Sequence, residues 1–137
     1  MPTVSLDFSP VPAQVRTVRL VTVAVARHAG LAEVHLDGVR QAIGEACSRA
    51  VARHQRSGNT ELIRVLITDD EVFSIRVIDR ADAGEAGLAE AEDDEGAFAD
   101  ETALALLKGL VERFALNRLA DGGTEVAMAW PLSQRRA

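Results

Sequence analysis

Cysteine is almost absent from this 137-residue chain, which contains only Cys47. One thiol cannot form an internal disulfide or a four-thiolate zinc site, so we exclude a cystine-rich secreted scaffold and a zinc finger. We expect Cys47 to be a buried small hydrophobic residue rather than a redox switch. The histidines, His28, His35 and His54, show no metal-ligand spacing, and we expect no metal site.

Long apolar runs are absent as well. No run reaches the roughly 18 residues that a membrane-spanning helix requires, and the N-terminus lacks the basic and apolar regions of a signal peptide. Only about one domain fits the length, and 47% hydrophobic residues are enough for a compact core. We therefore expect a single cytoplasmic domain over residues 1–137, without membrane contact.

Net negative charge is confined to one segment. Residues 79–101 contain ten of the 21 carboxylates and one arginine, so this segment carries −9 while the rest of the chain carries +3. Because large apolar residues are rare there, we expect a mobile, lid-like acidic loop at about residues 80–101. An isoelectric point near 5, and arginines that are not interleaved with aromatic residues, argue against direct nucleic-acid binding.

The hydrophobic patterns predict an alternation of strands and helices. Residues 4–8 alternate like a half-buried strand, and residues 12–29 keep helical spacing after a possible cap at Ser9. A second helix carries an apolar stripe from Leu36 to Ala50 and ends at Gly58. Two further strands follow over 62–68 and 72–78. After the acidic segment we expect a helix over 103–114 and a final hairpin with strands over 114–119 and 124–130. This order predicts an α+β two-layer sandwich, a mostly antiparallel sheet covered on one face by helices.

A polar ladder runs along the second helix, where Gln41, Glu45, Arg49 and Arg53 recur every four residues. Such spacing is typical of a solvated helix face with a weak Glu45–Arg49 ion pair. Two functional alternatives remain open for Arg49. It could hold a phosphate-bearing ligand without metal, or it could pair with carboxylates of the acidic loop between residues 90 and 95.

The segment 45–51, Glu-Ala-Cys-Ser-Arg-Ala-Val, is similar to the Glu-Ala-x-x-Asn-Ala box of the histidine-kinase-like ATPases with the Bergerat fold. Together with the element order, it resembles the single-domain branch of RsbW/SpoIIAB-type anti-sigma factors and serine kinases. Family members sequester a sigma factor and release it to a competing, STAS-type anti-anti-sigma antagonist. Typical members phosphorylate that antagonist with MgATP, and they are commonly dimeric.

The resemblance assigns roles to individual positions. Glu45 matches the general base, Asp79 matches the acceptor of the adenine amino group, and Arg19 matches an exposed arginine that contacts the sigma factor. Arg49 stands where the family has a Mg²⁺-ligating asparagine, and a guanidinium has no acceptor with which to bind a cation.

The family's glycines are also replaced. Ala81 and Ala83 stand at two glycine positions after Asp79, and Thr102-Ala103 aligns with the glycine motif that opens the last helix. An alanine pays roughly 1–2 kcal/mol in a left-handed conformation, and its methyl group obstructs the close approach of phosphate. We expect neither a cofactor nor a metal in the standard MgATP mode, with Glu45 as a vestigial base.

The resemblance and its departures lead to one preferred function and two alternatives. The preferred function is an anti-sigma factor without standard kinase activity. The alternatives are an active serine/threonine kinase that phosphorylates the antagonist, and a sensor that binds another nucleotide or metabolite.

Overall fold

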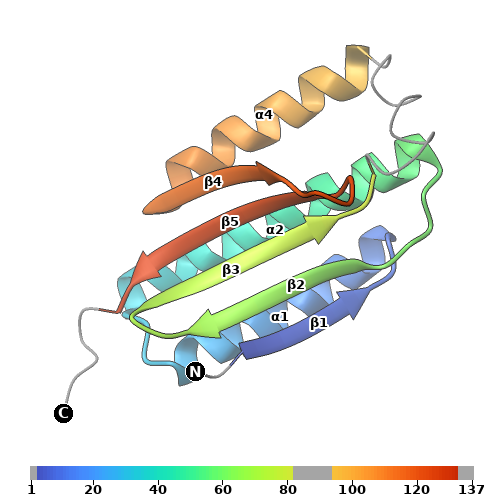
Figure 1. Ribbon diagram of the computed structural model, residues 1–137. Coiled ribbons are helices and arrows are strands. Elements are labelled where there is room, and N and C mark those ends of the chain that lie inside the picture. The colour runs from blue at the N-terminus through green and yellow to red at the C-terminus, as the bar shows by residue number, and fades with distance from the viewer. Residues whose placement is uncertain (1–2, 82–93, 133–137) are drawn as a thin grey trace.

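The described part of the protein forms a five-stranded antiparallel sheet with helices on one face (Figure 1). The computed structural model describes residues 3–81 and 94–132. The strand order is β1-β2-β3-β5-β4. The strands are β1 (Thr3–Phe8), β2 (Ile63–Asp69), β3 (Val72–Asp79), β4 (Arg113–Arg118) and β5 (Thr124–Pro131). The helices of the described part are α1 (Pro12–His28), α2 (Glu33–Ser57) and α4 (Asp94–Leu110). The predicted α+β architecture and element order are confirmed.

The core lies between the helices and the inner face of the sheet. In β3, Phe73, Ile75 and Val77 alternate with more exposed residues and point inward. β5 follows the same rule with Val126, Met128 and Trp130. Because side chains of a strand alternate between faces, the next inward position on β3 is Asp79. A carboxylate is therefore placed beneath the helices at the end of a central strand.

Helix α2 is the longest helix of the described part and crosses the sheet next to α1 and α4 (Figure 1). Its predicted apolar stripe is buried, and it ends at Gly58, whose left-handed φ of 71° suits a residue without a Cβ. Helix α1 stops near Gly30, as expected. Ser9 does not cap α1, because Val11 holds the cap position; the Ser9 N–H instead donates to the Gln14 side chain.

The acidic segment and the last helix differ from the prediction. Residues 94–101, expected in a loop, form the first part of α4, and the helix ends at Leu110 rather than residue 114. The alanine-rich sequence has a high intrinsic helix propensity, and Ala103 and Leu107 are buried, which favours the helix through packing. Phe114 lies on β4, opposite Met128 of β5. Residues 82–93, the remainder of the predicted lid, lie outside the described residues.

No helix in the described ranges is long and apolar enough to span a membrane.

Candidate functional site

A buried ionic cluster occupies the end of β3. Arg49 Nη1 lies 3.5 Å and Arg53 Nε 3.6 Å from Asp79 Oδ2, and all three side chains are at least nine-tenths buried. Both arginines belong to α2, one helical turn apart, so they approach the carboxylate from the same helix face. The predicted solvated ladder is therefore wrong at Arg49 and Arg53. The reason is that this face of α2 lies over the inward-pointing end of a strand.

The backbone after β3 is fixed by the same region of the molecule. The Ala81 N–H donates to Asp79 Oδ1 over 3.1 Å, which uses the second carboxylate oxygen. The Arg80 N–H donates to Nε2 of His54 over 2.9 Å, and the Asn59 side chain donates to the Arg80 carbonyl over 2.7 Å. The C-terminal end of α2 and the residues after it thus fasten Asp79 and its neighbours in place.

Burial shifts the pKa values of Asp79 and His54. Removal from water raises the pKa of the Asp79 carboxyl above its ordinary value, although the charges of Arg53 and Arg49 oppose the rise. Burial likewise lowers the pKa of His54, against the opposing effect of the Asp79 carboxylate. A neutral His54 is consistent with its geometry, because its Nε2 accepts a hydrogen bond from the Arg80 backbone.

We predict that His54 makes folding stability depend on mildly acidic pH. Its folded-state pKa is lowered from 6.5, so below about pH 6.5 the unfolded chain binds a proton that the folded chain excludes. Stability should therefore fall as the pH drops from about 6.5 towards that lowered value. Urea unfolding between pH 7.5 and 5 measures this loss.

In that experiment, His54→Gln should flatten the slope, because an amide oxygen can still accept the Arg80 N–H without titrating. The exposed His28 provides the control, and His28→Gln should keep the wild-type slope. Asp79 contributes a slope of opposite sign, confined to the pH range between its ordinary and its raised pKa. Equal slopes in wild type and His54→Gln would disprove the assignment.

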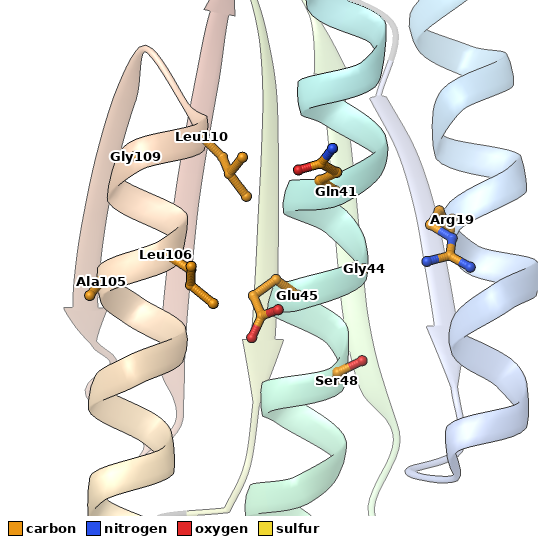
Figure 2. Close-up of a pocket in the computed structure, with 9 residues that line it drawn as sticks. All are labelled: Arg19, Gln41, Gly44, Glu45, Ser48, Ala105, Leu106, Gly109 and Leu110. Atoms are coloured by element: carbon orange, nitrogen blue, oxygen red, sulfur yellow. The ribbon is translucent and has the colours of Figure 1, made fainter.

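A second polar site lies on the outer face of the helix layer, in a groove of about 600 Å³ between α1, α2 and α4 (Figure 2). Arg19 of α1 and Glu45 of α2 line it, together with Gln41 and Ser48. The α4 wall consists of Ala105, Leu106, Gly109 and Leu110. The groove thus combines both signs of charge with an apolar side.

The residues that the resemblance placed in one nucleotide pocket contribute to two features that lie about one helical turn apart along α2. Asp79, Arg49 and the buried Ala81 meet in the ionic cluster, whereas Glu45 lies in the groove. Thr102 and Ala103 lie inside α4 rather than at its start, because that helix begins at Asp94. Ala83 and the predicted partners of Arg49 among residues 90–93 fall outside the described residues, as do the side chains of residues 94 and 95.

Arg19 is not the freely exposed residue that was predicted. It is half-buried, and its side chain lies against α2 at Gly44. A Cβ added to Gly44 would lie 3.1 Å from Arg19 Nη1 and 3.4 Å from its Cδ. The glycine therefore provides the space that the arginine occupies at the edge of the groove.

Sequence reasoning missed Arg53, His54 and Gly44 as site residues. The four-residue spacing from Arg49 already aligned Arg53, but only the position of Asp79 shows what the pair faces. His54 shows no metal-ligand spacing, yet it is fully buried and accepts a hydrogen bond from the Arg80 backbone N–H. A glycine inside a helix costs about 1 kcal/mol relative to alanine, and that cost was the available signal for Gly44.

Cys47 agrees with its predicted role. It is fully buried, and burial raises the pKa of its thiol to about 12. The reactive thiolate is therefore strongly disfavoured, and the residue packs as a small apolar side chain.

A family model of the histidine kinase-like ATPase domain matches residues 8–130. The chain therefore belongs to the histidine kinase-like ATPase family, in agreement with its helix and strand order. No curated protein matches the chain with significant similarity.

Proposed function

We propose that the protein is a cytoplasmic anti-sigma factor that binds its partner without standard MgATP kinase activity. The observation that carries the proposal is the ion-paired, buried state of Asp79. In the family that this chain resembles, the equivalent carboxylate accepts the adenine amino group. Here one oxygen accepts the Ala81 N–H and the other faces Arg49 and Arg53.

The residues that surround Asp79 do not fit MgATP bound in the family's usual way. An adenine amino group would have to compete with two guanidinium groups for an already paired carboxylate. Arg49 also has only hydrogen-bond donors, so it cannot supply the oxygen ligand that Mg²⁺ requires. The family's ATPase fold is retained, and Arg49, at the position of the Mg²⁺-ligating asparagine, and Asp79, at the position of the adenine-binding carboxylate, instead face each other.

A protein-binding role is consistent with what remains of the site. Arg19 and Glu45 line an open groove on the helix layer instead of a closed catalytic pocket (Figure 2). The resemblance makes a sigma factor the partner and assigns Arg19 to its binding. It also makes a STAS-type anti-anti-sigma protein the competitor, and a homodimer would accord with related proteins.

Two measurements on the purified chain test this function. We expect calorimetric titration with ATP and Mg²⁺ to show no micromolar binding, and co-purification from cells to recover an alternative sigma factor. Addition of the unphosphorylated antagonist should release that sigma factor. Micromolar MgATP affinity together with phosphate transfer to the antagonist would establish the kinase alternative instead. Binding of a different nucleotide or metabolite that changes partner affinity would favour the sensor.

A further inference from the structure

The groove between α1, α2 and α4 contains two opposite charges without partners in the described part of the chain. Arg19 and Glu45 are both half-buried, and neither forms a hydrogen bond or ion pair with another described residue. In Figure 2, Arg19 points from α1 towards α2, while Glu45 lies between α2 and α4. Half-buried charges lose part of their hydration, so a ligand that pairs with both would recover this loss.

The apolar wall of the groove belongs to α4. Leu106 is 52% exposed, an unusual position for a large aliphatic side chain, and Leu110 lies one turn further along the same helix. Gly109 lies between these leucines in sequence, and a Cβ added there would meet no atom within 4 Å. The wall is therefore both apolar and open to a closely approaching partner.

The dimensions and backbone chemistry of the groove favour a helical ligand. Its α2 side extends from Gln41 to Ser48, about 10 Å at 1.5 Å per residue, or roughly two helical turns. The groove walls are helices whose backbone groups are internally paired in this region. An extended peptide would therefore bury unpaired N–H and C=O groups there, whereas a helix satisfies its own.

We propose that this groove binds one amphipathic helix of a partner protein. The helix presents a carboxylate to Arg19, a cationic side chain to Glu45 and apolar side chains to Leu106 and Leu110. This inference rests on the proposed function, because it describes how a partner is held. It assigns Glu45 to recognition of a cation and makes Gly44 a positioning residue for Arg19.

The first test uses the sigma factor recovered by co-purification and measures its affinity by fluorescence anisotropy. Arg19→Glu and Glu45→Lys should each raise the Kd about tenfold or more, because each places like charges opposite each other. Arg16→Glu and Glu71→Lys make the same charge changes at exposed positions outside the groove and should leave the Kd within about twofold. Equal effects at groove and control positions would overturn the proposal.

Gly44→Ala tests whether the position of the Arg19 side chain affects binding, independently of folding stability. Alanine should maintain or raise the melting temperature, since it is the better helix former, while its Cβ displaces the Arg19 guanidinium and weakens binding about tenfold. An unchanged affinity in this variant would show that the position of Arg19 is irrelevant to recognition.

The second test does not depend on a sigma factor. A phage-displayed library of preformed helices, randomised on one face, is selected against the full chain. Selected helices should combine an acidic and a basic residue at fixed spacing and lose affinity for both Arg19→Glu and Glu45→Lys. Selection of no helix, or of helices insensitive to both variants, would overturn the groove assignment.

The two tests distinguish a failure of the proposed anti-sigma function from a failure of the groove assignment. Charge-dependent helices without any sigma-factor partner would retain the groove and reject the anti-sigma function. Sigma-factor binding that ignores every groove variant would retain the function and reject the groove.

Discussion

Replacing Asp79 by alanine is expected to lower the free energy of unfolding by about 3–5 kcal/mol. Asp79 is 1% exposed and lies 3.5–3.6 Å from two buried guanidinium groups. Without the carboxylate, Arg49 and Arg53 would retain their desolvation cost but lose this counter-charge. The substitution also removes the acceptor of the Ala81 N–H. Urea unfolding monitored by circular dichroism measures the change.

A matched triple variant distinguishes charge loss from volume loss. Arg49→Met, Arg53→Met and Asp79→Val together remove the three charges of Arg49, Arg53 and Asp79 while keeping their summed side-chain volume close to that of the wild type. Replacing a buried ion pair by well-packed apolar residues is often neutral or stabilising by about 1–4 kcal/mol. The triple variant should therefore be much more stable than Asp79→Ala. If both variants are equally unstable, the ion pair is not the cause of the loss.

Gly123→Ala is expected to destabilise the fold by about 1–3 kcal/mol through overpacking. A Cβ at this position would lie 2.8 Å from the Asp79 carbonyl oxygen and 3.0 Å from Arg80 Nη1. The first contact is with backbone, which cannot move away as a flexible side chain can. The strain would act where Thr124 pairs with Asp79 in the β3–β5 ladder. Chemical denaturation gives the loss, and it should appear without any change in charge.

Gly109→Ala serves as the control for this substitution. It exchanges the same residue types on α4, where the added methyl group meets no atom within 4 Å. Alanine should stabilise the helix by up to about 1 kcal/mol. A loss at Gly109 as large as that at Gly123 would contradict the close-contact explanation.

The fold was predictable because its local and periodic signals agree. The alternation from Val72 to Ile78 and the helical stripe from Leu36 to Ala50 each match the structure. The Gly58 stop also agrees, since a left-handed residue ends α2 there. The start of α4 was misjudged because the sparse apolar residues of the acidic segment suggested a loop. Helix propensity and packing of Ala103 and Leu107 decided otherwise.

The sequence by itself determined the order of strands and helices and the four-residue spacing of Glu45, Arg49 and Arg53 along α2. These follow from residue identity and from periods of two and 3.6 residues. Only the tertiary structure decided that Arg49 and Arg53 face Asp79, and that Glu45 and Arg19 line the same groove. The physical reason is that ion pairing and burial depend on which faces of separate elements meet. The pattern of a single helix cannot distinguish a solvated ladder from one that covers a buried carboxylate.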